Sequence, residues 1–123
     1  MATRQEQVLS ILERLSNNGG ADITGSVAVS MDGIVLASRM SNDINADRVG
    51  AVAATMVGVS RRVSGELKIG LAEEAILKSA NGMFIVLPAG DQAMLAVNMK
   101  QGANLGMVRI EARDAAAEIG KVV

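Results

Sequence analysis

The chemistry open to this chain is limited first by the residue types that it lacks. Its 123 residues include no cysteine and no histidine, which excludes thiol chemistry, imidazole general-base catalysis and the common zinc ligand sets. Carboxylates remain, but the aspartates are scattered without the spacing of a calcium loop: Asp22, Asp32, Asp43, Asp47 and Asp91. We therefore expect no metal site, no cofactor and no catalytic residue.

Three glycine-containing pairs could belong to a phosphate-binding loop: Asp32-Gly33, Asn81-Gly82 and Gly90-Asp91. Such a loop opens a helix and carries a lysine followed by a hydroxyl residue, and that pattern is absent from the sequence. Each pair instead lies between apolar runs, where glycine accepts the positive φ of a tight turn. Turn formation is the better interpretation of all three.

Arg48, Arg61 and Arg62 are the only basic residues between Asn45 and Ser64. Such a cluster is most often a solvated helix face, and the alternative is a contact surface for another protein. An arginine-finger role, in which the side chain supplies charge to a transferring phosphate in trans, suits a helix poorly because such a finger needs the reach of a loop.

These arginines lie on a predicted helix, Asn45 to Ser64, that is too apolar to have only one buried face. At about 100° per residue, Arg48, Thr55 and Arg62 form a polar wedge between two apolar sides. We assign one side to the sheet, namely Val49, Val52, Met56 and Val63. The small residues of the other side would let a second copy of the helix approach closely: Gly50, Ala54, Val57 and Gly58. The alternative is that these small residues fit the helix tightly over its own sheet.

The first half of the chain predicts a helix followed by a hairpin. Apolar residues at helical spacing run from Thr3 to Leu15, and Thr3 and Glu6 have the spacing of a capping box. Two apolar runs, SVAVS and IVLAS, are joined by Met31-Asp32-Gly33, which is a strong hairpin signal.

The second half predicts three strands and a closing helix. The runs LAEEAILKS, MFIVLP and AMLAVNM are separated by turn residues, and the last two are apolar on both faces, so both faces need cover. An apolar stripe from Ala103 to Ile119 predicts the last helix. The fold class is therefore α/β of the α+β kind: a five-stranded antiparallel sheet with helices on both faces, in the order α-β-β-α-β-β-β-α.

The strand that carries Glu73, Glu74 and Lys78 is the least apolar of the five, as expected for a sheet edge. If two copies pair antiparallel about Ile76, Glu74 of one chain lies opposite Lys78 of the other. Such a pair is worth roughly 0.2–1 kcal/mol, enough to set register more than affinity. The alternative is that these charges are solvated on an ordinary exposed edge.

Composition limits the partners. A chain of 123 residues is expected to form a single domain, residues 1–123. Its 12 basic and 13 acidic residues nearly cancel, and it has almost no aromatic side chains, so we expect no nucleic-acid binding. The start, MATRQEQVLS, lacks an apolar segment after its arginine, and no apolar run approaches the roughly 20 residues of a membrane span. We expect no membrane insertion and a cytoplasmic location.

Several segments, taken in order, resemble the roadblock family, which includes a class of dynein light chains. They are GSVAVSMDG at 25–33, NGMFIV at 81–86, GDQAMLAV at 90–97 and NLGMVRIE at 104–111. The resemblance implies a profilin-like roadblock fold with the central helix on one face of the sheet and the terminal helices on the other. It also implies a homodimer in which the central helices pack together and the middle strands join into one longer sheet.

The function implied by this resemblance is regulation of a small Ras-like GTPase by a protein that is not itself an enzyme. On this hypothesis the dimer interface holds Gly50, Ala54, Val57, Gly58, Glu74, Ile76 and Lys78, and the GTPase-binding residues are Arg48, Arg61 and Arg62. The alternative is a dimeric scaffold of a signalling or motor-associated complex that leaves nucleotide hydrolysis unchanged.

Overall fold

The computed structural model describes residues 2–123 as a five-stranded sheet with three α-helices. In chain order the elements are α1 (Arg4–Gly19), the short helix η1 (Gly20–Asp22), β1 (Ile23–Ser30), β2 (Val35–Arg39), α2 (Ala46–Glu66), β3 (Ala75–Ser79), β4 (Gly82–Ala89), β5 (Ala93–Lys100) and α3 (Leu105–Val122). This is the predicted element order.

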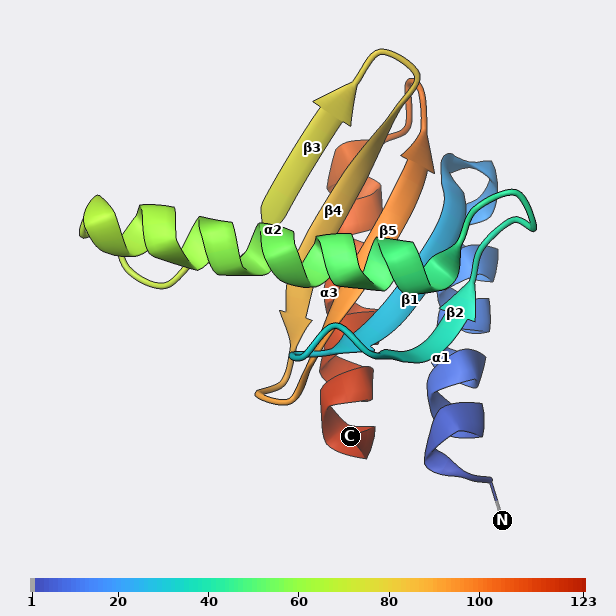
Figure 1. The fold of residues 1–123 in the computed structure, drawn as a ribbon. Helices are drawn as coiled ribbons and strands as arrows, with labels where there is room; N and C mark the ends of the chain where they lie inside the picture. The colour runs from blue at the N-terminus through green and yellow to red at the C-terminus, as the bar shows by residue number, and fades with distance from the viewer. Residues whose placement is uncertain (1) are drawn as a thin grey trace.

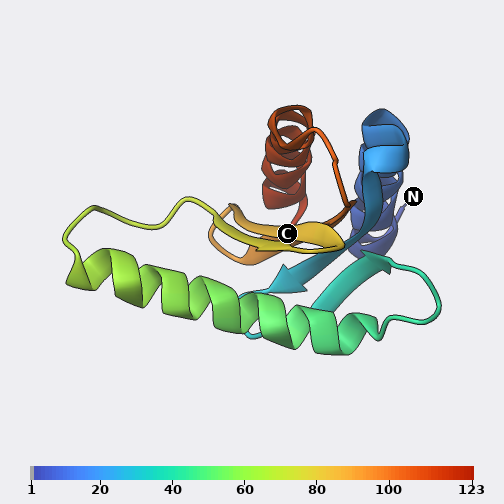
Figure 2. The same ribbon diagram turned by 90° about the horizontal axis from the view of Figure 1, so that it is seen from above.

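The strands lie in the order β2-β1-β5-β4-β3, and every neighbouring pair is antiparallel. Helices α1 and α3 lie side by side on one face, and α2 crosses the other face (Figures 1 and 2). The C-terminal half of α2 extends past β3, the strand at one edge of the sheet (Figure 1). The predicted layers are confirmed.

Two apolar cores cover the two faces of the sheet. The larger core joins the sheet to α1 and α3 and includes Leu12, Ile85, Leu95 and Ile119. The smaller core lies under α2 and includes Val27, Val29, Val86 and Met94. Successive strand residues point to opposite faces, so β4 and β5 contribute to both cores and are apolar apart from Asn98 and Lys100 of β5.

Local sequence signals account for most element boundaries. Thr3 and Glu6 form the predicted capping box of α1, and the side chain of Asn45 accepts a hydrogen bond from the backbone N–H of Arg48 at the start of α2. Gly33 has a φ of 87°, as the predicted tight turn between β1 and β2 requires.

Two boundaries differ from the prediction. Strand β3 begins only at Ala75, so Glu73 and Glu74 lie on the linker from α2 rather than on the edge strand. Helix α3 continues to Val122, and Gly120 packs so closely on the turn before β5 that a methyl group there would lie 2.9 Å from the Gly90 nitrogen. Glycine is required at this contact because any side chain would collide with backbone.

Candidate protein-interaction surface

The side of α2 that faces the sheet is the small-residue side. Gly50 and Ala53 are buried, and a methyl group at Gly50 would lie 2.9 Å from Cγ2 of Val35 and 3.3 Å from the Gly33 carbonyl oxygen. Ala54 and Val57 pack on the smaller core. Branched side chains of the sheet meet the helix at Gly50, so only a small residue fits at that position.

This orientation corrects the predicted faces of α2. Val52 is 55% exposed and Val63 is 50% exposed, so their assignment to the sheet is wrong, whereas Val49 and Met56 do pack on the smaller core. Gly50, Ala54 and Val57 serve the contact between the helix and its own sheet, which leaves them little surface for a second helix.

Gly58 alone of the four predicted interface residues on α2 is exposed, with open space around its Cα. The alternative interpretation, that the small residues fit the helix over its own sheet, holds for Gly50, Ala54 and Val57.

Exposed apolar side chains gather at the C-terminal end of α2 and on the linker that follows it. Their exposed fractions range from 50% to 73%, and we call them the α2 ridge: Val59, Val63, Leu67, Ile69 and Leu71. The linker part was not predicted, although alternation of apolar residues from Leu67 to Leu71 was a readable signal. Leu71 also lines a hollow on the α3 side of the sheet, so these side chains do not all share one face. Exposed apolar side chains that lie together mark an interaction surface.

An apolar groove of 630 Å³ lies at the other end of α2. Its walls are the first half of α2 and the β3–β4 hairpin, and Leu77, Met83 and Phe84 contribute from the strands. Val49 and Val52 contribute from the helix, and Arg48 is the only charged residue in the lining. This groove, named the α2 groove below, was not predicted because it depends on how α2 crosses the sheet.

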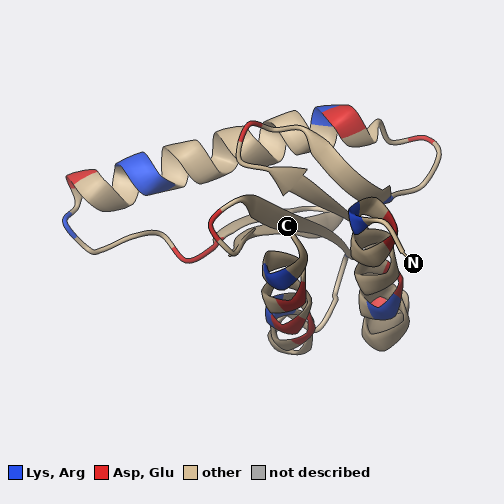
Figure 3. Cartoon of the chain, turned by 90° about the horizontal axis from the view of Figure 1, so that it is seen from below, with Lys and Arg blue, Asp and Glu red and all other residues tan. Residues whose placement is uncertain are grey.

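The three predicted GTPase-binding arginines do not form one cluster. Thirteen residues separate Arg48 from Arg61, which is about 20 Å along a helix, and Figure 3 shows basic residues near both ends of α2 with none along its middle. Arg48 lines the α2 groove and Arg62 is exposed.

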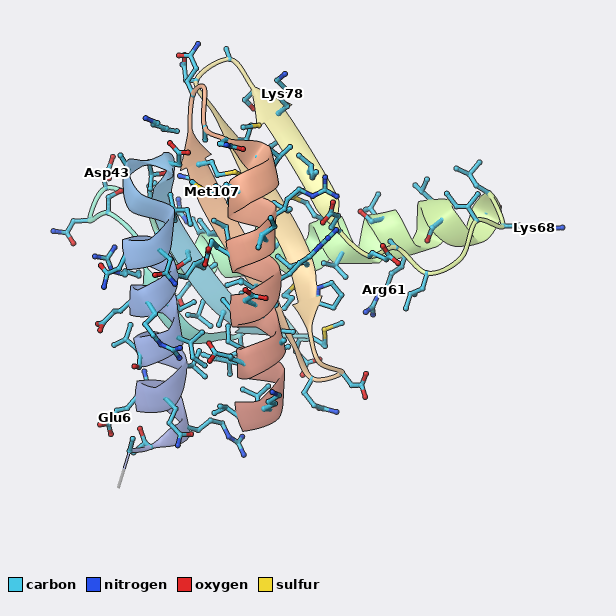
Figure 4. All side chains as sticks on the ribbon, turned by 180° about the vertical axis from the view of Figure 1, so that it is seen from behind. Glu6, Asp43, Arg61, Lys68, Lys78 and Met107 are labelled. Atoms are coloured by element: carbon cyan, nitrogen blue, oxygen red, sulfur yellow. The ribbon has the colours of Figure 1, made fainter. Side chains whose placement is uncertain are left out.

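Arg61 is turned toward the linker to β3 (Figure 4). It lines a small hollow with Ala72 and Glu73, and its Nε is buried without a hydrogen-bond partner in residues 2–123. Of the three arginines, Arg61 is the least available to another protein.

Glu74 is held within its own chain. Its carboxylate pairs with Arg109, and its Oε2 lies 3.6 Å from Nη2 of Arg113, so α3 fixes the linker from the face opposite α2. The side chain of Glu74 is only 14% exposed. This carboxylate therefore already has two cationic partners in its own chain, and its pairing with Lys78 of a second chain stays a prediction.

The other two predicted edge residues are accessible. Ile76 is 42% exposed and Lys78 is exposed on β3, where its side chain points away from the sheet (Figure 4). Their place at a dimer interface stays a prediction.

Two further findings concern residues 2–123 as a whole. They contain no group of three or more acidic, histidine or cysteine side chains placed to hold a metal ion. No helix among them is both long and apolar enough to cross a membrane.

Known proteins share this arrangement of a five-stranded antiparallel sheet with α2 on one face and two helices on the other. MglB of Myxococcus xanthus has the same fold with a TM-score of 0.87 and 16% identity, over 99% of this chain and 91% of that one. Profilin II of Acanthamoeba castellanii superposes with a TM-score of 0.64 and 13% identity, over 91% of this chain and 95% of that one.

The fold therefore defines a protein of the roadblock class, which is profilin-like. The Roadblock/LC7 domain matches residues 8–98, and an uncharacterised protein of Methanocaldococcus jannaschii is 32% identical over 105 residues, or 85% of this chain and 91% of that protein. The chain belongs to the Roadblock/LC7 domain family.

Proposed function

We propose that this chain is a non-enzymatic, homodimeric regulator or adaptor of a small Ras-like GTPase in the cytoplasm. The proposal rests on its membership of the roadblock family and on one structural observation. Helix α2 has 21 residues, lies over the sheet with its small-residue side, and leaves the rest of its surface open along its whole length. A long rigid helix with an open surface suits recognition of another folded protein.

The side of α2 opposite the sheet is the surface that we assign to the GTPase. Ala51, Thr55 and Arg62 are exposed there, so a flat strip of short side chains carries one long cationic side chain. Because Arg48 lines the groove and Arg61 is turned to the linker, Arg62 is the arginine best placed to meet acidic residues of a switch region.

Regulation on this scheme is a difference in affinity for two switch conformations. A protein that binds one conformation better shifts the GTPase toward it, and a protein that binds both equally shifts nothing. A tenfold preference corresponds to about 1.4 kcal/mol. The chain then needs no catalytic residue of its own, in keeping with the absence of histidine and cysteine from its sequence.

The test measures binding to a purified Ras-like GTPase and the rate of GTP hydrolysis by that GTPase, with and without this protein. We expect Arg62→Glu to weaken binding about tenfold, because an acidic partner surface then meets a negative charge. Arg4→Glu, at the exposed start of α1 on the other face of the sheet, makes the same charge change and should have no effect. Equal affinity of the two variants would contradict the assignment of Arg62.

A dimeric scaffold that leaves hydrolysis unchanged is the second candidate. One observation favours it, an open hollow of 710 Å³ on the α3 side of the sheet, lined by Leu71, Leu87, Pro88 and neighbours. A second partner there would make the protein a bridge between two proteins. Retained GTPase binding with an unaltered hydrolysis rate would support the scaffold.

A further inference from the structure

We infer that the open hollow on the α3 side of the sheet, called the α3 hollow below, binds an extended segment of a second, different protein. In this segment an aliphatic side chain lies between an acidic and a basic residue. The inference rests on the scaffold candidate and names the chemistry of its second partner. The α3 hollow lies on the face of the sheet opposite α2 (Figure 2), so a segment bound there leaves α2 free for the GTPase.

The α3 hollow exists because the linker leaves the sheet before β3 begins. If the register of β3 on β4 continued upstream from the pair Ala75 and Val86, Glu73 would lie opposite Pro88, which has no N–H to offer such a pair. On the α3 side the short side chains of Ala116 and Ala117 line the space that results. Its volume of 710 Å³ is within the range of about 300–1,000 Å³ that is usual for ligand pockets.

The apolar part of this surface is uncovered in residues 2–123. Leu71 lines the hollow and is 71% exposed. Ile110, which is 61% exposed, lies two turns from Ala117 and about 20° from it around the α3 axis. The apolar surface therefore continues from the hollow along α3, which suits a chain segment better than a compact small molecule.

The linker beside the hollow has backbone groups available for a partner. Within residues 2–123, Gly70–Glu73 form no hydrogen bond with another backbone group. The linker is nevertheless held in place, because Glu74 pairs with Arg109 and Arg113 of α3. An extended segment gains affinity by pairing its own N–H and C=O groups with such a backbone, and a linker that is already fixed loses little freedom on binding.

Arg113 and Glu73 give the hollow one positive and one negative wall. Arg113 is 57% exposed on α3, and the nearby carboxylate of Glu74 is shared with Arg109. Glu73 is exposed on the linker and has no ion-pair partner within 4.0 Å in residues 2–123. A segment that turns an acidic residue to α3 and a basic residue to the linker complements both charges, and the reverse arrangement is repelled.

The test begins with a phage-displayed library of random dodecapeptides selected on the purified full chain. We expect selected peptides in which an aliphatic residue lies between an acidic and a basic one, and fluorescence anisotropy gives their Kd. Ala117→Glu should raise this Kd about tenfold, because a charged side chain enters the apolar part of the hollow. Ser10→Glu, on the exposed side of α1, is the matched control and should leave the Kd unchanged.

Failure to select such a peptide, or equal binding to both variants, would overturn the inference. A change in the mass of the protein's own oligomer with Ala117→Glu, measured by light scattering, would show that a second copy is the occupant and would also overturn it.

A double-mutant cycle tests the charged contact. Arg113→Gln should weaken peptide binding about fivefold, and so should replacement of the acidic peptide residue by its amide, with no further loss when the two changes are combined. Lys121→Gln, at the exposed end of α3, is the control and should have no effect. Additive losses would show that Arg113 and the acidic residue do not meet, which would overturn the proposed orientation of the segment.

Exchange of the acidic and basic residues within the peptide tests both walls together. The exchanged peptide should bind about tenfold more weakly, because each of its charges then meets a like charge, and unchanged binding would contradict the two-walled hollow. GTPase binding by the same protein sample separates the two proposals. Loss of peptide binding alone would overturn this inference, whereas loss of GTPase binding alone would overturn the proposed regulation.

Discussion

At the scale of single residues, Gly50 and Gly58 of α2 have different surroundings, which the sequence does not reveal. Gly50 lies against Val35 and the Gly33 carbonyl, where the sheet leaves no room for a side chain. Gly58 has open space around it. A glycine within an exposed helix costs about 0.5–1 kcal/mol relative to alanine, so only the first has a steric reason inside this chain.

We therefore expect opposite effects from two alanine substitutions. Gly58→Ala should raise the free energy of unfolding by about 0.5–1 kcal/mol through helix propensity. Gly50→Ala should lower it by about 1–2 kcal/mol, because the added methyl group forces Val35 and the neighbouring backbone to shift. Urea unfolding of both variants measures the difference, and stabilisation by Gly50→Ala would contradict the observed face of α2.

At the scale of elements, the linker between α2 and β3 is fixed from the α3 side. Glu74 is largely buried between this linker and α3, and it pairs with Arg109 and Arg113. The Nε of Arg109 is buried without a hydrogen-bond partner in the described part of the chain. The carboxylate therefore offsets a partly desolvated charge and holds the linker that precedes the edge strand.

Glu74→Gln should loosen β3 more than the rest of the sheet. We expect a loss of about 1 kcal/mol in stability and faster amide hydrogen exchange in β3. The control is Glu118→Gln, which removes a carboxylate from a more exposed pair with Arg14, with side chains 44% and 57% exposed. Exposed pairs contribute about 0–1 kcal/mol, so the control should change little, and equal exchange in both variants would refute this role of Glu74.

At the scale of the whole molecule, α2 contributes both to the folded core and to the surfaces available for association. One side of it completes the smaller core, and the remainder offers the groove, the ridge and the outward strip. Substitutions on the two sides should therefore separate stability from assembly.

Val63→Glu should give a folded monomer, because it places a charge on an exposed ridge position and leaves the core untouched. Ala54→Arg should instead lower the thermal midpoint, because Ala54 packs on the smaller core and a methyl group at Gly33 would lie 3.5 Å from its Cβ. Circular dichroism and light scattering distinguish the two results. A folded monomer from Ala54→Arg and a dimer from Val63→Glu would instead support the assignment of the α2 faces that was predicted from the sequence.

The sequence by itself determined the elements, since turns and caps act locally. Asp32-Gly33 fixes its hairpin through backbone conformation, and Thr3 and Asn45 begin helices by accepting hydrogen bonds from backbone N–H groups. The second hairpin lies where it was predicted, but its turn residues are Ala80 and Asn81, because Gly82 already pairs with Ser79 as the first residue of β4. Apolar runs then indicated which strands are covered on both faces. These signals need no knowledge of distant residues, so they gave the elements and their order in the chain, whereas the placement of α2 opposite α1 and α3 was implied by the resemblance to the roadblock family.

Only the tertiary structure decided which side of α2 meets the sheet. Both sides of this helix are apolar, so periodicity identifies two apolar faces but does not show which of them meets the sheet. From the sequence, the face with the larger valines is the better candidate for the core. The choice depends on the surface beneath, where Val29 and Val35 rise toward Gly50 and allow only a small residue. The ion pairs of Glu74 could not be predicted from the sequence for a similar reason. Its partners Arg109 and Arg113 lie more than thirty residues away in the sequence and reach it only through packing of α3 on the sheet.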